Sequence, residues 1–233
     1  MRRAERAGFV AGDRSEWVAR LLEREIRMQA DTFVGIQELR DLVDAMEVSH
    51  PALIAEVVPR AMTLAQIAEI LRRLVREGVS ILDLRTILEA LAVEAQIERD
   101  PTVLTELVRS HMKRHLTAAA VRGHESLPVY RLTPNVEQII YESIKIGRGN
   151  GEVALPPEFV HGFVERLHEL DRRPRERGAL EPVLVVPREI RPFVWELLHG
   201  RAPNISVYAY DDLLPSVVLR AVGIVGEAAR GST

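Results

Sequence analysis

The sequence contains no cysteine and few aromatic residues. None of its 233 residues is a cysteine, and phenylalanine, tryptophan and tyrosine together make up 5% of the chain. Without thiols there is no disulfide, no thiolate metal site and no cysteine nucleophile, which is compatible with a reducing cytosol. With so few aromatic residues, the core must be built from leucine, isoleucine, valine and alanine. That bias favours helices that pack through aliphatic stripes.

Long apolar runs and a large net charge are also missing. No stretch approaches the roughly 20 apolar residues that a helix needs to cross a bilayer. The first residues, Met1–Glu5, lack the apolar centre of a signal peptide. The formal net charge is −3, so the chain as a whole is not attracted electrostatically to a nucleic acid or an acidic membrane. We therefore expect this region to be soluble as it stands.

Apolar residues recur at helical spacing through the first half of the chain. The pattern predicts helices over residues 15–28, 36–46, 51–58 and 63–95, the last being a helix pair, and from Asp100–Pro101 past Met112. The pair carries the clearest signals, because Thr63 and Gln66 form a capping-box pattern and Gly78 fits the left-handed residue after a helix end. Ser80 and Asp83 repeat the start signal for the second helix of the pair.

Strands alternate with helices after about residue 120. Predicted strands cover residues 127–132, 182–186, 205–210 and 217–225, and predicted helices start at Thr133–Pro134, Pro157 and Pro187. The segment Gly147–Gly151 is predicted to be a turn, with a short strand after it. The predicted fold class is therefore α+β and mostly helical, with a helical bundle followed by a small α/β unit.

Two histidine pairs are the candidate metal ligands in the sequence. His111 and His115 lie four residues apart on a predicted helix, but no glutamate is placed as in the zinc motif His-Glu-x-x-His and no third ligand is evident. A metal-dependent enzyme that uses this pair is one alternative, and two partly buried polar residues beside an apolar stripe are the favoured one. His161 and His168 are interpreted as surface residues of an amphipathic helix. The sequence thus predicts no metal, no cofactor and no catalytic residue.

Glycine-rich and basic segments also have simpler interpretations than ligand binding. Gly147–Gly151 follows a helix, precedes a strand and lacks the lysine of a Walker loop, so a turn fits better than a phosphate-binding loop. The basic clusters Met112–His115 and Arg172–Arg177 offer neither aromatic residues for base stacking nor a helix presented to a groove. Docking of an acidic protein segment suits the second cluster better than a nucleic acid does, and simple solvation suits it better still.

Charged residues gather around Gly78, on two helices whose other sides are aliphatic. They are Arg72, Arg73, Arg76 and Glu77 before the turn, and Asp83, Arg85 and Glu89 after it. Arginine can hold a carboxylate through two parallel hydrogen bonds, which suits it to fixing the register of a protein interface. Pairing of these charges within the helix pair is the equal alternative.

The same segment resembles a known family. Arg73–Leu91 closely resembles the signature of the type III secretion export-gate family, which includes the flagellar protein FlhA and the injectisome proteins InvA and LcrD. Further segments resemble family landmarks in the family order, and they are Phe33–Glu38, Leu42–Glu47, Asp100–Arg109 and Leu127–Pro134. The final subdomain of the family is matched more loosely, by Pro182–Tyr210.

The resemblance implies a division of the chain and a place for it. Residues 1–35 would be a remnant of the first cytosolic subdomain with a connecting helix, 36–122 the helical third subdomain, and 123–233 the α/β fourth. The full-length protein would lie in the bacterial inner membrane through an N-terminal half that this chain lacks, with this region on the cytoplasmic side. Since the third subdomain is the main ring contact of the family, the expected oligomer-interface residues are Arg72, Arg76, Glu77, Asp83, Arg85 and Glu89.

The implied function is protein export without catalysis. The resemblance implies a homo-oligomeric ring, expected to be a nonamer, that docks secretion substrates with their chaperones, a gatekeeper protein and the stalk protein of the associated ATPase. No nucleic acid is expected as a partner. Phe33–Glu38 and Asp44–Glu47 look more like the injectisome branch, which serves virulence, than the flagellar one. The flagellar paralogue remains the alternative.

Overall fold

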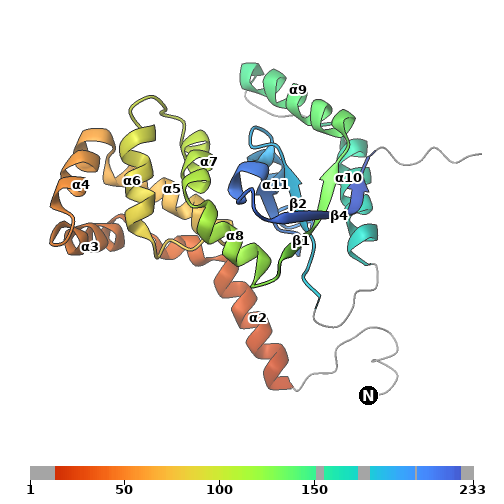
Figure 1. Ribbon diagram of the computed structural model, residues 1–233, viewed down its shortest axis with the longest axis horizontal. Coiled ribbons are helices and arrows are strands. Elements are labelled where there is room, and N and C mark those ends of the chain that lie inside the picture. The colour runs from red at the N-terminus through yellow and green to blue at the C-terminus, as the bar shows by residue number, and fades with distance from the viewer. Residues whose placement is uncertain (1–13, 151–154, 173–178, 203, 227–233) are drawn as a thin grey trace, which may run out of the picture. The chain divides into compact units, whose positions relative to one another are not determined.

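The computed structural model describes residues 14–150, 155–172, 179–202 and 204–226 (Figure 1). Contacts between residues divide the chain into two compact units, Met1–Thr105 and Glu106–Thr233. The boundary falls inside helix α7 (Pro101–His111). The predicted fold class is confirmed, because a run of helices is followed by helices combined with a small sheet. The division at residues 35 and 122 stays a prediction.

Helices alone make up the described part of the first unit. They are α2 (Arg14–Met28), the short 3-10 helix η1 (Ala30–Phe33), α3 (Ile36–Glu47), α4 (Pro51–Glu56), the π-helical turn η2 (Val57–Ala61), α5 (Leu64–Arg76), α6 (Leu84–Glu94) and the start of α7. The most deeply buried side chains of α5 and α6 are aliphatic, as the scarcity of aromatic residues predicts. They are Ile67, Ile70, Leu71, Leu74, Ile87, Leu88 and Leu91.

Both ends of α5 have the predicted caps. The N–H of Thr63 donates to Gln66 Oε1 at 2.9 Å, and the N–H of Gln66 donates to Thr63 Oγ1 at 3.3 Å, so the capping box is confirmed. At the other end Gly78 has a φ of 74°. The N–H of Val79 donates to Leu74 O at 2.8 Å, which is the long bond of a Schellman motif.

The start of α6 differs from the prediction by three residues. Ser80 Oγ accepts a hydrogen bond from the N–H of Leu82 at 3.3 Å, which is a local turn and not a helix cap. Asp83 caps the helix instead, and α6 begins at Leu84. The prediction from Ser80 was wrong because serine and aspartate have similar capping tendencies, and only the backbone path decides which of them is used.

The second unit contains a sheet of four parallel strands in the order β3-β2-β1-β4. The strands are β1 (Ser126–Leu132), β2 (Val183–Val186), β3 (Val207–Ala209) and β4 (Val218–Val225). Its helices are the end of α7, α8 (Lys113–Val121), α9 (Pro134–Asn150), α10 (Pro157–Asp171), α11 (Arg191–Leu198) and the 3-10 helix η3 (Tyr210–Asp212). The strands predicted at 127–132, 182–186, 205–210 and 217–225 are all present.

Two clusters of apolar residues include residues of this sheet. The larger joins residues of β1, β2 and β4 to α9, α10 and α11, and its most buried members include Leu167 and Leu184. The smaller joins β1 and β2 to Ala120 of α8 and to Leu213 after η3. Helices on parallel strands are the expected cover for such a sheet. Among the helices described, none is long and apolar enough to cross a membrane.

Three local predictions in the second half of the chain need correction. The turn predicted at Gly147–Gly151 is helical as far as Asn150, because α9 continues through its glycines, whose helical cost is only about 1 kcal/mol each. The strand predicted after it, and most of the basic cluster Arg172–Arg177, fall outside the described residues.

The helix expected from Pro187 begins at Arg191, after a turn in which the Arg191 N–H donates to Pro187 O at 3.1 Å. The helix expected to pass through Met112 is divided there into α7 and α8.

Replacing Gly78 with alanine is expected to lower the free energy of unfolding by about 1 kcal/mol, because an L-residue resists a positive φ. The methyl group itself has room, since no atom lies within 4 Å of the added Cβ. Gly162 of α10 has equal room but lies inside a helix, so Gly162→Ala should raise the free energy of unfolding by up to about 1 kcal/mol. Denaturant unfolding measures both variants, and a shift of the same sign in the two would contradict this account.

Candidate functional site

Two of the six predicted interface residues have structural roles inside the first unit. Arg72 Nε–H donates to the backbone oxygen of Val34 at 2.7 Å and so ties α5 to the segment after η1. Asp83 Oδ1 accepts the Thr86 N–H at 3.2 Å as the N-cap of α6. Both side chains are half-buried. They hold the surface around the α5–α6 turn in shape.

Of the other four predicted residues, Arg76, Arg85 and Glu89 are exposed and Glu77 is half-buried. Arg85 Nε and Glu89 Oε1 form an exposed ion pair at 2.7 Å on α6. The hydrogen bond to Glu89 raises the pKa of the Arg85 guanidinium, which therefore stays charged. Arg76 is exposed in the last turn of α5, and Glu77 is the C-cap of that helix. Because an exposed ion pair adds little stability, the Arg85–Glu89 pair contributes little to holding the fold.

Exposed apolar side chains also lie in α6 and just beyond both of its ends. Leu82, before the helix, is 95% exposed, and Ile97, after it, is 86% exposed. Val93 lies in the last turn and is also exposed. Positions 85, 89 and 93 are four residues apart, which places them on one side of the helix. We call Leu82, Arg85, Glu89, Val93 and Ile97 the α6 stripe.

Sequence reasoning found the charged members of the α6 stripe and missed the apolar ones. It assigned Ile87, Leu88 and Leu91 to the buried side, where the structure places them. Val93 falls four residues after Glu89, on the exposed side, and that spacing was the signal available in the sequence. Covering an exposed apolar side chain removes its surface from water and is favourable, whereas an exposed charge is already solvated.

A pair of buried charges in the second unit was not predicted. Glu106 of α7 and Arg191 of α11 are both buried, and the guanidinium donates from Nε and Nη2 to the two carboxylate oxygens. Glu106 lies in the family landmark Asp100–Arg109, and Arg191 lies in Pro182–Tyr210, which resembles the final subdomain of the family more loosely. In these two segments, therefore, some of the residues that resemble the family serve to hold the fold together.

A second buried pair lies one helical turn further along α7. Arg109 Nη2 is 2.5 Å from Asp212 Oδ2, and both side chains are buried. The same carboxylate oxygen accepts the N–H of Ala209 at 2.9 Å, which closes η3 onto the end of β3. Burial also raises the pKa of Tyr208, on β3. No pattern of short spacing in the sequence points to Asp212 as the partner of Arg109.

The histidines occupy the surface of the second unit. His111 and His115 are exposed, where partly buried positions were expected. His161 is exposed as predicted, but His168 is half-buried, and its Nε2 is 3.0 Å from the backbone oxygen of Arg201. Among the residues that the structure describes, no three histidine or acidic side chains are grouped so as to hold a metal ion.

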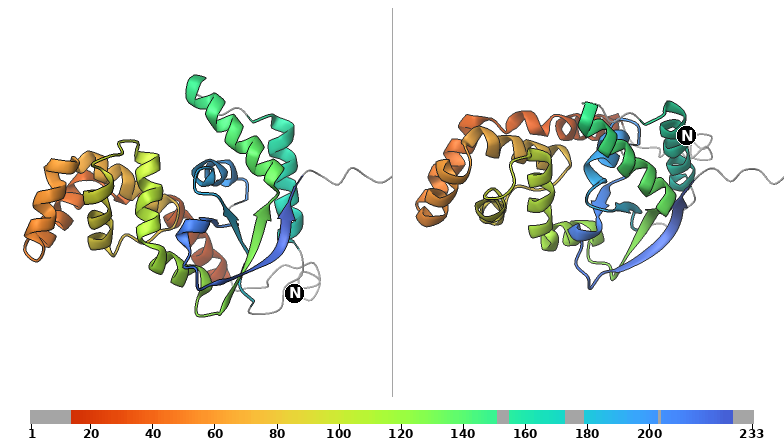
Figure 2. Two further views of the ribbon diagram at one scale, coloured as in Figure 1. Left: turned by 45° about the horizontal axis from the view of Figure 1, so that its top comes forward. Right: turned by 90° about the horizontal axis from the view of Figure 1, so that it is seen from above.

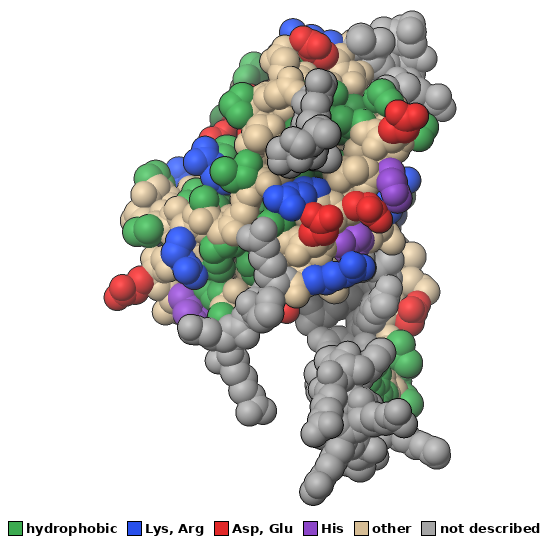
Figure 3. All heavy atoms as spheres, turned by 90° about the vertical axis from the view of Figure 1, so that its right-hand side faces the viewer, with side chains coloured by type: hydrophobic (Ala, Val, Ile, Leu, Met, Phe, Trp, Pro, Cys, Tyr) green, Lys and Arg blue, Asp and Glu red, His purple; other side chains and the backbone are tan. Residues whose placement is uncertain are grey.

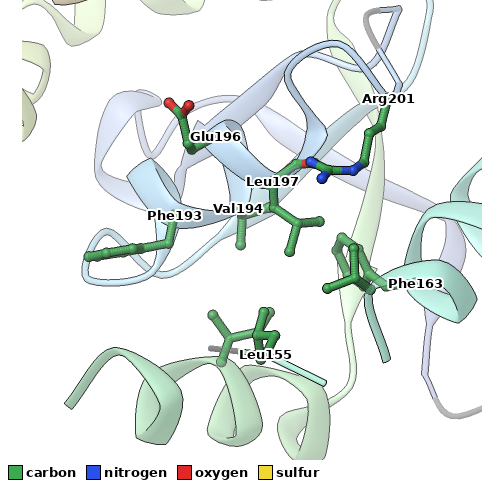
Figure 4. Close-up of a pocket in the computed structure, with 9 residues that line it drawn as sticks. Leu155, Phe163, Phe193, Val194, Glu196, Leu197 and Arg201 are labelled. Carbon is green, nitrogen blue, oxygen red and sulfur yellow. The ribbon is translucent and has the colours of Figure 1, made fainter. Parts of the chain in front are cut away.

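A cavity of about 340 Å³ lies between α9, α10 and α11 (Figure 4). Its wall is mainly apolar, and Phe163, Phe193, Val194 and Leu197 are among the residues that line it. Arg201 lies at one side and donates through Nη1 to the backbone oxygen of Leu197 at 2.9 Å. The cavity offers room for apolar side chains, and Glu196 and Arg201 are the charged residues of its lining.

Solved structures share this architecture. The chain resembles a chain of the Chlamydia pneumoniae CdsV and CdsO complex with a TM-score of 0.82 and 33% identity, over 95% of this chain and 65% of that one. It resembles the nonameric cytosolic domain of EscV from the type III secretion system with a TM-score of 0.74 and 30% identity, over 89% and 61%. The fold is that of the C-terminal cytosolic domain of a type III export gate.

Sequence comparison identifies the family. The model of the FHIPEP family matches residues 1–218. Protein hrpC2 of Xanthomonas euvesicatoria is 33% identical over 208 residues, low calcium response locus protein D of Yersinia pestis 32% over 202, and FlhA of Salmonella typhimurium 30% over 223. These alignments cover 89%, 87% and 96% of this chain and 32%, 28% and 31% of the relatives. The chain therefore belongs to the FHIPEP family and spans about a third of the length of these relatives.

Proposed function

We propose that this chain is the ring-forming cytosolic domain of a type III export gate, and that it acts by holding other proteins and not by catalysis. The observation that carries the proposal is the α6 stripe, in which exposed apolar side chains flank a charged pair. The nonameric assembly of the EscV cytosolic domain supports it. Covering the apolar ends of the stripe would drive association, and the charges would fix its register.

The proposed interface joins the stripe to the residues predicted from the sequence. Arg76, Glu77, Arg85 and Glu89 would contact the neighbouring subunit, while Arg72 and Asp83 would act by keeping the α5–α6 turn in shape. Leu82 and Ile97 would supply most of the buried apolar area. Full burial of one such side chain contributes about 1.5–3 kcal/mol.

Replacing Leu82, Val93 and Ile97 together with serine is expected to weaken assembly by at least about tenfold, because the apolar area that a neighbour would cover is lost. Multi-angle light scattering over a concentration series measures the association, and circular dichroism checks the fold. Val48→Ser is the matched control, since Val48 is 88% exposed and lies outside the stripe.

Two results would contradict the proposal. One is a triple variant that assembles as the wild type does. The other is a wild-type chain that stays monomeric at the highest concentration and also after fusion to the preceding cytosolic segment of the Yersinia pestis relative. The fusion is included because the chain spans only 28% of that protein.

We propose secretion substrates with their chaperones, a gatekeeper protein and an ATPase stalk protein as partners. The complex of CdsV with CdsO supports the existence of a protein partner for this fold. Purified CdsO should bind the chain in biolayer interferometry, with the CdsV cytosolic domain as positive control. Full binding by CdsV and none by this chain would count against a CdsO-like partner.

The injectisome branch is the favoured assignment, and the flagellar paralogue is the alternative. Identities of 33% and 32% to hrpC2 and the Yersinia pestis protein, against 30% to Salmonella FlhA, support it. In the full-length protein an N-terminal half would anchor this domain on the cytoplasmic side of the inner membrane. Exchange of this domain for its counterpart in the Yersinia pestis protein and in FlhA tests the branch. Restored motility without restored injectisome secretion would reverse the assignment.

A further inference from the structure

Strand β4 lies at the edge of the sheet and is unusually apolar for that place. Its eight residues, Val-Leu-Arg-Ala-Val-Gly-Ile-Val, include one charge, on Arg220. Val218 is 63% exposed and Ile224 is 57% exposed. Figure 2 shows β4 at the border of the second unit, with α10 beside it. Long apolar edge strands template pairing with another chain, and soluble proteins usually shorten, charge or cover them.

The backbone of β4 can accept another strand. Its described partner is β1 alone. Val225 O accepts the N–H of Thr133, which follows β1, at 2.9 Å, so Val225 faces β1. Because backbone groups alternate along a strand, the N–H and C=O of Ile224 point away from β1, toward the open edge. No backbone partner for them is found among the described residues.

An acidic groove of about 710 Å³ adjoins the end of this edge. Ile224 and Gly226 line it together with residues of α10, which include Phe159 and Phe163. Its charged residues are Glu158, Glu165, Glu169 and Arg166. Figure 3 shows acidic and basic side chains close together on this side of the molecule.

The charges of the groove leave an acidic excess. Arg166 Nη1 pairs with Glu169 Oε2 at 2.8 Å, and the ring of His161 lies 3.8 Å from Glu165 Oε1. Within the described ranges, no lysine or arginine forms an ion pair with Glu158 or Glu165. A ligand that lies along the edge and reaches into the groove would therefore gain from carrying lysine or arginine.

We propose that β4 and the acidic groove together bind an extended, basic segment of a partner protein by strand addition. The main chain of the segment pairs with the open edge. Its apolar side chains cover Ile224, which shares a sheet face with its β1 partner Arg131, and its basic side chains, on the α10 face, reach Glu158 and Glu165. A register shift in the pairing of β1 with β4, between Val129 and Tyr130, marks a bulge that bends the edge. Bulges oppose pairing between identical edges, which favours a different protein over a second copy. The inference does not depend on ring assembly.

The probe is a fluorescein-labelled eight-residue peptide that alternates valine and lysine, titrated with the full chain in fluorescence anisotropy. It should bind at least about tenfold more tightly than the same peptide with glutamate in place of lysine. Methylation of the peptide nitrogens at every second residue, on the side that pairs with β4, should weaken binding by about tenfold or more, because it removes the N–H donors that pair with the strand. Equal binding by the methylated peptide would overturn strand addition.

Two protein variants locate the site. Ile224→Pro removes the outward N–H without removing a bond to β1, so it should abolish peptide binding and keep the circular dichroism spectrum. The double variant Glu158→Gln with Glu165→Gln should weaken binding about fivefold and make binding less sensitive to salt. Its control is Glu181→Gln with Glu189→Gln, two exposed glutamates outside the groove. The control should change neither the affinity nor its salt dependence. Equal effects of the two double variants would overturn the acidic site. Sedimentation that shows wild-type dimers and Ile224→Pro monomers would assign the edge to a second copy instead.

Discussion

Arg191→Met is expected to destabilise the second unit by about 3–5 kcal/mol, which corresponds to a fall in the melting temperature of roughly 6–20 °C. The guanidinium of Arg191 is buried and donates two hydrogen bonds to the carboxylate of Glu106, which is itself buried. Methionine fills a similar volume but leaves the carboxylate in the interior without its cation. Differential scanning calorimetry and urea denaturation measure the loss.

The partner of Arg191 allows a sharper test than a single variant. Adding Glu106→Leu to Arg191→Met replaces the buried ion pair with two apolar side chains, and most of the lost stability should return. Arg188→Met is the matched control, because Arg188 is more exposed and its only ion pair given by the structure, with Asp211, is loose at 3.6 Å. If the double variant is no more stable than the single one, the loss comes from altered packing and not from an unpaired charge.

Asp212→Ala should have an effect of similar size, about 3–5 kcal/mol, for a related reason. The carboxylate lies 2.5 Å from Arg109 Nη2 and also accepts the N–H of Ala209. Alanine removes the counter-charge of a buried arginine and one backbone hydrogen bond of η3 at once. The free energy of unfolding from urea denaturation is the measurement.

The residue next to Asp212 provides the control for this variant. Asp211 is exposed, so Asp211→Ala should change the free energy of unfolding by less than about 1 kcal/mol. Asp212→Asn can still accept from Ala209 but lacks the charge, and it should fall between the two. A loss in Asp211→Ala as large as that in Asp212→Ala would show that the segment as a whole, and not the buried pair, sets the stability.

Much of the fold could be predicted from short-range patterns. The helix pair is the clearest case, because Thr63 with Gln66 and the glycine at 78 act on backbone groups only a few residues away. The strands were also predicted, because short apolar runs bounded by prolines and polar turns are typical of buried strands. Errors arose where two local options have similar free energy, as with Ser80 and Asp83 as caps, or with helix and turn at Gly147–Asn150.

The candidate site was predicted in part. The charges of the α5–α6 region were found from the sequence, but their uses were not, because a charge pattern does not show which side chain bonds to the fold. Arg72 bonds to Val34, 38 residues away, while Arg85 pairs locally with Glu89. Exposure of Leu82 and Ile97 could not be read from the sequence, because it depends on whether another segment of the fold packs against them.

The sequence by itself determined the family, the fold class, the aliphatic core and the helix pair around Gly78. These features depend on residue types and on spacings of a few residues, which act through local backbone geometry. The tertiary structure decided which charges stabilise the interior and which surface remains for partners. Arg191 and Glu106 are 85 residues apart, and Arg109 and Asp212 are 103 apart. Only the folded sheet and helices bring such residues within hydrogen-bonding distance, and only burial then makes their charges costly to leave unpaired.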